Sequence, residues 1–393
     1  MPVLVGERRL VISMRIIALV YLVLVSSLAA FADDEEANEV TAIHPQKDTR
    51  PAVAPDIRDD ESKLKAQKGN FVAVPIPFSN PTFNAGLVAG AAYFYPQSEE
   101  EKKVEPASLT GVGGMYSSND SKALGIGQQN YWRGNWRFTG VLVAADLRLS
   151  LLTPEDTTSG DSVDWNIRGG LFFAKLARKI KGNWYGGILT RYVDAEQAIE
   201  GLDPGEESDF DLQSHLRSVG AGFYGEYDTR DMPTNAHTGQ HFTLNALFND
   251  EVIGSDSTYQ SYSASFRSYH KLSDSLVLAW ELQGCRRAGT TPLWDACRLK
   301  LRGFSATDYM GKVTTSGQVE ARWHLSKRWG AVAFAGAGYV GSSYNGIREN
   351  EPIPSYGVGV RFSVLPAKRI NIRVDYARSI DSDAFLLSVG EAF

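Results

Sequence analysis

The chain has 393 residues, of which 40 are basic and 46 acidic, so its formal net charge is −6. That balance excludes a generally basic protein that binds nucleic acid. Glycine and aromatic residues are plentiful, with 37 glycines, 17 tyrosines and 18 phenylalanines.

The N-terminus has the features of a cleavable signal peptide over residues 1–32. A short basic start precedes an apolar run, Ile16 to Leu28, and Ala30-Phe31-Ala32 supplies small residues for cleavage. The run is too short for a membrane-spanning helix. Met14 is an alternative start. Residues 33–69 are polar, charged and almost without apolar periodicity, which predicts a flexible periplasmic tail.

From Asn70 onward, apolar and polar residues alternate, the pattern of β-strands with two different faces. In the stretch 313–326, for example, Val319 and Trp323 share one face, while Glu320 and Arg322 share the other. The pattern predicts about sixteen strands, at 70–79, 84–96, 107–120, 122–133, 136–152, 163–180, 184–199, 211–230, 240–254, 258–272, 275–289, 313–326, 330–343, 355–366, 370–380 and 384–393.

Either a soluble sandwich or a membrane barrel would produce such alternation, and three features favour the barrel. Short turns recur at every second connection, longer polar loops occupy most of the others, and the strand count is even. The last strand also closes on a face with a terminal aromatic residue, formed by Phe385, Leu387, Val389 and Phe393. In lipid a sheet must close on itself. We therefore predict an all-β fold, a transmembrane antiparallel β-barrel over residues 70–393, in the bacterial outer membrane.

The connection between the eleventh and twelfth predicted strands holds about two dozen residues, far more than a hairpin needs. It carries Leu301, Arg302, Gly303 and Phe304. One interpretation is a long loop that folds inward and sets the guanidinium against a buried carboxylate, with glycine allowing close backbone approach. The alternative is an ordinary surface loop.

The two cysteines, Cys285 and Cys297, lie twelve positions apart in a chain predicted to be exported. Disulfides form and persist outside the cytoplasm, so we expect these two to be joined; two unrelated free thiols are the alternative. Strand parity turns Cys285 toward the lumen, so the disulfide would anchor the base of the loop. The spacing of the cysteines and the lack of companion ligands argue against a metal site, and no cofactor is indicated.

The sixteen strands, the loop with Arg302 and the terminal Phe393 together resemble the BamA/TamA family of bacterial surface antigens. Two further stretches are similar. One is a strand end and periplasmic turn with Asp228, Thr229, Arg230, Asp231, Pro233 and Gly239; the other is the closing stretch 388–393. The resemblance covers about residues 70–393.

The resemblance implies that the loop enters the lumen and that Arg302 pairs with an acid on the barrel wall. The family often supplies an Asp from strand thirteen, but here the matching stretch, Phe334 to Gly338, has none. Glu320 is the substitute that we expect, and Asp375 the second choice. The alternative is that both acids merely line a hydrated lumen.

A second departure concerns the periplasmic side, because residues 33–69 are too few for a client-binding domain. The resemblance then implies a barrel-only member, in protein or lipid assembly or translocation, whose seam between residues 70–79 and 384–393 opens laterally. Its partners would be outer-membrane lipid, lipopolysaccharide, and unfolded outer-membrane or secreted proteins. One alternative is a structural or passive, porin-like barrel narrowed by its loop. Another is an outer-membrane hydrolase near His324, although the sequence has no Gly-x-Ser-x-Gly motif.

Overall fold

The computed structural model describes residues 69–98, 101, 106–152, 162–200, 210–343, 350–366, 369–380 and 382–393. The predicted signal peptide and nearly all of the predicted tail lie outside these ranges, as do most of the predicted loops 200–210 and 344–354. Within them, no helix is long and apolar enough to cross a membrane.

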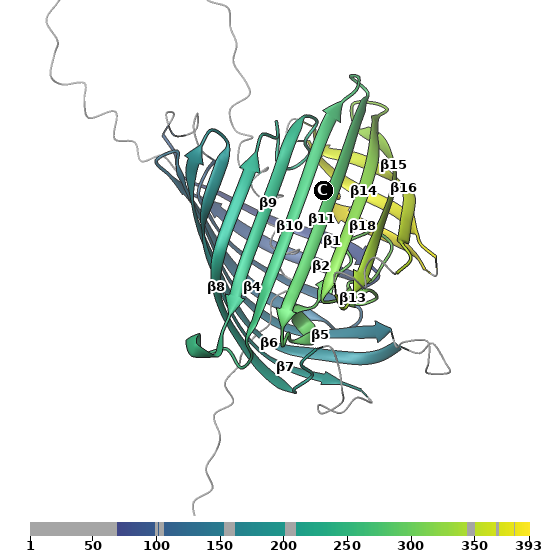
Figure 1. The fold of residues 1–393 in the computed structure, drawn as a ribbon. Helices are drawn as coiled ribbons and strands as arrows, with labels where there is room; N and C mark the ends of the chain where they lie inside the picture. Colours follow the sequence, from purple (N-terminus) through teal and green to yellow (C-terminus); the bar gives the residue numbers. More distant parts are fainter. Residues whose placement is uncertain are drawn as a thin grey trace, which may run out of the picture.

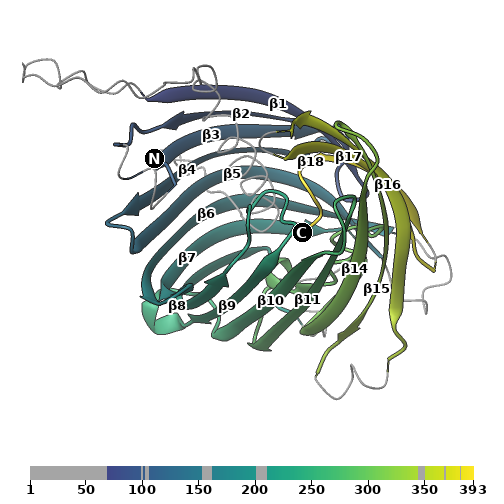
Figure 2. The ribbon, with the colours of Figure 1, turned by 90° about the horizontal axis from the view of Figure 1, so that it is seen from above.

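The described chain forms a closed barrel of sixteen antiparallel strands, as predicted (Figures 1 and 2). Each strand pairs with its neighbours in sequence, and β1 meets β18 to close the ring. The barrel strands are β1 (Asn70–Asn80), β2 (Asn84–Phe94), β3 (Leu109–Ser117), β4 (Lys122–Trp132), β5 (Trp136–Leu152), β6 (Ser162–Lys181), β7 (Trp184–Ile199), β8 (His215–Asp228), β9 (Gly239–Asn249), β10 (Tyr259–Lys271), β11 (Leu276–Gly289), β14 (Val313–His324), β15 (Trp329–Gly341), β16 (Ile353–Leu365), β17 (Ile370–Arg378) and β18 (Asp383–Val389).

Four short elements were not predicted. The connection between β11 and β14 contains the 3-10 helix η4 (Leu293–Asp295) and a two-stranded ladder of β12 (Cys297–Arg298) with β13 (Met310–Gly311). The predicted strand 240–254 ends at Asn249, and η3 (Glu251–Ile253) follows. There the Asp250 side chain accepts a hydrogen bond from the Val252 backbone at 2.8 Å, which caps η3 and ends the extended backbone.

Burial separates the two faces of the strands. On β14, Gln318, Glu320 and Arg322 are buried, whereas Val319 and Trp323 are exposed on the opposite face. The exposed apolar residues form the outer, lipid-facing surface, and the buried residues line the inside. Alternation in the sequence therefore identifies the inner residues correctly on this strand.

The inner face differs between the two halves of the barrel. Polar and charged residues line most of it on β10 to β17, where β15 with Val332 and Phe334 is an exception, but on β1 to β7 it is mostly apolar. That apolar lining packs into one cluster, which includes Ile76, Val88, Phe94, Leu109, Val143, Leu147, Trp165, Ile167, Leu171 and Val193. Leu293 and Trp294 of η4 belong to the same cluster. The long loop is thus bound to this half by hydrophobic packing.

The last strand is shorter than predicted. The sequence places Phe393 on the same strand face as Phe385, but β18 ends at Val389. Gly390 follows with a φ of 90°, a conformation that favours glycine, and the chain turns inward, so its C-terminal end lies inside the ring in Figure 2. Phe393 is buried in a cluster with Ala236 and Tyr269, while Phe385 is exposed.

The orientation of the faces can be tested on Val358, an outward residue in the middle of β16 with 58% of its surface exposed. We expect Val358→Arg to lower the free energy of unfolding in lipid by about 2–4 kcal/mol. Asp383→Arg, at the start of β18, is the control and should cost about 0–1 kcal/mol near the interface. Urea titration followed by the mobility of unheated samples on SDS gels measures both, and equal losses would contradict the assignment.

Candidate functional site

The connection between β11 and β14, residues 290–312, contains the predicted loop motif and one of the two cysteines. A disulfide joins Cys297 in this loop to Cys285 on the inner face of β11, which confirms the predicted pairing. The loop then runs through β12 to Arg302 and returns through β13. A covalent link therefore fixes the base of the loop to the barrel wall.

Arg302 is buried and reaches acids on two strands. Its Nη1 lies 2.5 Å from Oε2 of Glu320 on β14 and 3.3 Å from Oδ2 of Asp375 on β17. Its Nε donates to Gln318 at 2.8 Å, and the guanidinium carbon lies 3.3 Å from the centre of the Phe334 ring. Both acids are those named from the sequence. Phe334, in the stretch that lacks the family's Asp, contacts the same guanidinium.

The neighbours of Arg302 hold the backbone in place. The Arg302 carbonyl accepts a hydrogen bond from Ser355, and the Gly303 carbonyl accepts one from Ser382. Gly303 has a φ of 97°, and a Cβ there would lie 3.2 Å from the Ala377 Cβ, so both conformation and space favour glycine. Phe304 is buried and packs edge-to-face on Tyr309. Leu301 is partly buried.

The acids that bind Arg302 also bind two further arginines. Glu320 accepts a hydrogen bond from Arg322 at 2.6 Å, and Asp375 accepts one from Arg361 at 2.5 Å. Both arginines reach the C-terminal residues. Arg361 donates to Glu391 at 2.7 Å, and Arg322 donates to the Phe393 backbone oxygen at 2.8 Å. One buried network of charges therefore connects the long loop to the chain beyond β18.

A second anchor, which the sequence did not reveal, uses the opposite arrangement of charge. Asp295 in the loop is fully buried, and its carboxylate lies 2.6 Å from Arg191 of β7 and 3.3 Å from Arg287 of β11. Tyr259 and Ser261 of β10 also donate to it, at 2.8 and 3.1 Å. A buried carboxylate is stable only with such partners.

One inward arginine, Arg191, gave a signal that could have led to this anchor. Arg191 lies among the apolar inner residues of β7, with Leu189 and Val193 on either side. A buried arginine on such a face needs a carboxylate nearby. Sequence alternation shows which way Arg191 points, but does not show that Asp295 lies opposite.

The tip of the loop contacts the other side of the barrel. Thr307 donates to the backbone oxygen of Ser150 on β5, at 2.6 Å. The Ala306 backbone donates to Thr82, in the turn between β1 and β2, at 2.8 Å. With the contacts to β7, β14 and β17, the loop joins strands that are far apart around the ring. The role predicted for it in the lumen stays a prediction.

The predicted periplasmic motif forms the connection from β8 to β9. Asp228 ends β8 and forms an ion pair with Arg230 at 2.7 Å, while Gly239 begins β9. The Thr229 backbone donates to Gln240 at 2.9 Å. Pro233 accepts a hydrogen bond from Arg230 through its carbonyl.

Asp231 in this motif ties the turn to a distant connection, between β16 and β17, through an ion pair with Arg369 at 2.6 Å. Burial alone would raise the pKa of the Asp231 carboxyl. The hydrogen bonds from Arg369 and from the backbone N–H groups of His237 and Thr238 outweigh burial and lower that pKa. The carboxyl is therefore charged at neutral pH, as the ion pair requires.

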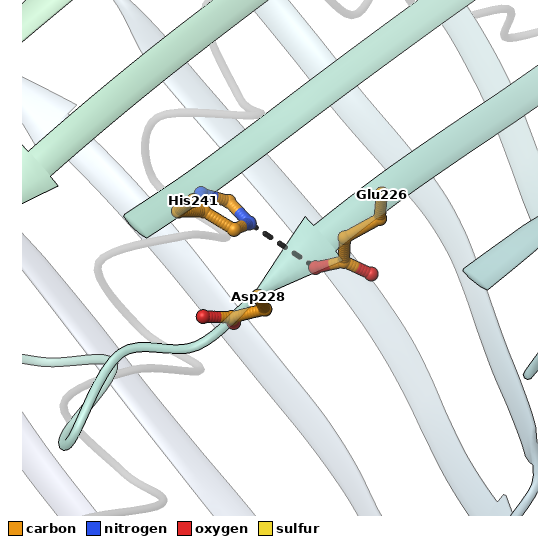
Figure 3. Close-up of side chains that lie close together, drawn as sticks. All are labelled: Glu226, Asp228 and His241. Atoms are coloured by element: carbon orange, nitrogen blue, oxygen red, sulfur yellow. Dashed lines mark hydrogen bonds and ion pairs between the residues drawn. The ribbon is translucent and has the colours of Figure 1, made fainter. Parts of the chain in front are cut away.

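Glu226, Asp228 and His241 lie close together at the ends of β8 and β9 (Figure 3), with one ligand atom of each within 4.8 Å of the others. Such a group could hold a metal ion by geometry. However, Glu226 already accepts hydrogen bonds from His241 and Arg137, each at 3.1 Å, and Asp228 is paired with Arg230. These cations compete with a metal for the same oxygens, so we assign no metal to this cluster.

The disulfide can be tested by replacing Cys285 and Cys297 with serine together. Loss of the cross-link should lower the free energy of unfolding by about 2–3 kcal/mol in the chain-entropy model. Urea unfolding of the barrel in lipid measures the change. Mass spectrometry of wild-type protein from the oxidised cell envelope is the companion measurement, and two free thiols there would contradict the link.

Asp295→Asn should lower the free energy of unfolding by about 3–5 kcal/mol, because Arg191 and Arg287 would remain buried without their carboxylate. Asp308→Asn makes the same chemical change in the same loop, where the carboxylate accepts a hydrogen bond from the Ser305 backbone. An amide oxygen can still accept that bond, so we expect a loss below about 1 kcal/mol. Equal losses in urea unfolding would show that Asp295 is not an anchor.

The barrel is similar to solved structures at low sequence identity. It matches the crystal structure of BamA from Haemophilus ducreyi lacking POTRA domains 1-3, with a TM-score of 0.58 and 12% identity, over 83% of this chain and 70% of that one. It also matches CdiB from Escherichia coli, with a TM-score of 0.56 and 11% identity, over 81% of this chain. CdiB from Acinetobacter baumannii matches with a TM-score of 0.53 and 11% identity, over 83% of this chain. The chain spans only 62% and 60% of the two CdiB chains.

A search of curated proteins found no match to the sequence. The comparison with protein families did find a match, since residues 135–385 match the Omp85 superfamily domain. That match spans more than half of the chain and covers strands from β5 to β18, including the long loop. The protein is a member of the Omp85 superfamily and an outer-membrane β-barrel.

Proposed function

We propose that this protein assembles or translocates other proteins at the outer membrane, and that clients engage it at the seam between β1 and β18. Superfamily membership supports the general role. The observation that carries the proposal is the shortness of the seam. Between β1 and β18 a single residue pair, Ser79 with Leu387, is in register, whereas β1 and β2 share eleven pairs.

The prolines of β1 account for part of this weakness. The ladder between β1 and β2 runs without interruption past Pro75 and Pro77. A continuous antiparallel ladder requires that residues 74, 76 and 78 exchange the hydrogen bonds with β2, so the proline nitrogens face the seam. Proline has no N–H to donate, so β1 offers two fewer backbone donors across the seam.

The inward turn at Gly390 accounts for the rest. Continuing the register of Ser79 with Leu387 would place Val389 beside Pro77 and residue 391 beside Pro75. The chain instead leaves the sheet after Val389, because Glu391 is held by Arg361 and Asn371, each at 2.7 Å. Fewer backbone hydrogen bonds then oppose the separation of β1 from β18 than oppose the separation of β1 from β2.

A disulfide across the seam tests the proposal. Ser79→Cys with Leu387→Cys places the two thiols on registered partners and, once oxidised, should abolish assisted folding of an unfolded outer-membrane barrel by proteoliposomes that contain the protein. Reduction should restore it. The matched control, Ser79→Cys with Ala85→Cys, cross-links the registered partner on β2 and should leave assistance unchanged.

Unchanged assistance by the oxidised seam variant would overturn lateral opening. If the wild-type protein gives no assistance with any unfolded barrel and its absence from cells leaves the outer-membrane and secreted proteomes unaltered, the assembly role itself is wrong. Steady bilayer conductance that ignores substitution of Arg302 would then favour the porin-like alternative.

A further inference from the structure

The outer surface of β4 to β7 carries charged residues in a row that crosses the strands in register. Lys122 pairs with Asp146, Asp146 with Arg168, and Arg168 with Glu196. These side chains lie on the lipid-facing side, because they alternate with buried residues such as Leu147 and Ile167. Arg148 lies on the same face of β5, one step further toward the external end.

Two arginines in this region form no ion pair with the described residues, although acidic residues lie on neighbouring strands. Asp146 is already bound by Lys122 at 3.6 Å, and among the described residues no ion pair joins Arg168 to Glu196, its registered neighbour on β7. Arg148 and Arg168 are exposed, and within the described part of the chain neither guanidinium has an ion-pair partner. They lie on adjacent strands, near each other because Arg148 is paired with Asn166. Paired guanidinium groups of this kind bind phosphate through two-pronged hydrogen bonds.

An apolar hollow of about 470 Å³ lies on the same outer surface, further toward the periplasm. Its floor is a row of small residues in register across three strands, Ala174, Thr190 and Ala221. Bulky residues surround it, among them Phe138, Ile188, Phe223 and Phe248. The surface that this hollow offers to a ligand is almost entirely apolar, which suits an acyl chain.

The spacing of the hollow and the arginines matches a lipid. Six residues separate Arg168 from Ala174 on β6, which is about 20 Å along a strand. With the usual strand tilt of about 40°, the depth between them is about 15 Å, or one leaflet of the hydrocarbon core. A phosphate at Arg168 would thus belong to a molecule whose acyl chain ends over the hollow.

A polar hollow of about 370 Å³ continues this surface at the external rim, and Arg148 lines it too. The other polar groups around it are Thr82, Asn84, Asn119, Ser150, Asp164, Asn166, Ser305 and Asp308. Amides, hydroxyls and carboxylates of this kind exchange hydrogen bonds with sugar hydroxyls. Two of them, Ser305 and Asp308, come from the long loop.

We propose that the outer surface of β4 to β7 binds the phosphorylated glycolipid of the outer leaflet, lipopolysaccharide. Its phosphates bind Arg148 and Arg168, an acyl chain covers the hollow over Ala174, and its inner sugars occupy the polar hollow at the rim. The order of the three features, apolar, cationic and polar, follows the order of the parts of that lipid. This inference does not depend on the seam or on any protein client.

Equilibrium titration of the purified barrel in mixed micelles with fluorescent lipopolysaccharide tests the site. Arg148→Gln with Arg168→Gln should weaken binding at least about tenfold, since two charge-assisted contacts are lost. Arg178→Gln with Lys181→Gln removes the same charge from the periplasmic end of β6 and should leave the affinity unchanged. Equal affinity in the two double variants would overturn the proposal.

Two further measurements do not depend on the folding of the arginine variant. Dephosphorylated lipopolysaccharide should bind wild-type protein at least about tenfold more weakly than the intact lipid. Ala174→Trp fills the floor of the hollow and should weaken binding several-fold, whereas Ala331→Trp, on β15, should not. Indifference to the phosphates would contradict the arginine site, and indifference to Ala174→Trp would contradict the acyl-chain site.

Discussion

Pairing of every backbone N–H and C=O group is the constraint on which this structure depends. In a hydrocarbon core water cannot satisfy an unpaired strand edge, so a sheet that spans the membrane must close into a ring. Fifteen of the sixteen contacts between neighbouring strands in this barrel are ladders of seven or more registered residue pairs. The sixteenth, between β1 and β18, has a single pair. The contact that closes the ring is therefore the one held by the fewest registered backbone pairs.

A buried network of side-chain charges lies beside that contact, on β14, β16 and β17, and holds the chain that follows β18. Arg302, Glu320, Asp375, Arg322 and Arg361 form a continuous buried network that ends on the residues after β18. Buried ion pairs contribute little net stability, because desolvation offsets most of the attraction, but they restrict where each group can lie. The network thereby fixes the position of the external loop relative to the residues that follow the last strand.

The sequence predicted the fold closely because the membrane imposes a period-two pattern that local residues report. Alternation identified the strands and predicted that Glu320 and Cys285 point inward, while the disulfide was predicted from the presence of two cysteines in a chain expected to be exported. It did not identify contacts across the ring. Asp295 and Arg191 are separated by 104 positions, and no local pattern links a loop carboxylate to an arginine on β7. The turn at Gly390 was missed for a related reason, since the partners of Glu391 and Phe393 lie on other strands.

The attachments of the long loop differ greatly in the length of chain that each one closes. The disulfide closes 12 positions, the Arg302–Asp375 contact 73 and the Arg191–Asp295 contact 104. The entropy lost on closure grows with the length of the closed segment, and local contacts form sooner in folding. A disulfide that forms before the barrel closes would tie the loop base to β11 while β7 and β17, which carry the most distant attachments, are still separate. The loop would then enter barrel closure already bound at one end, and only its tip would have to find its position.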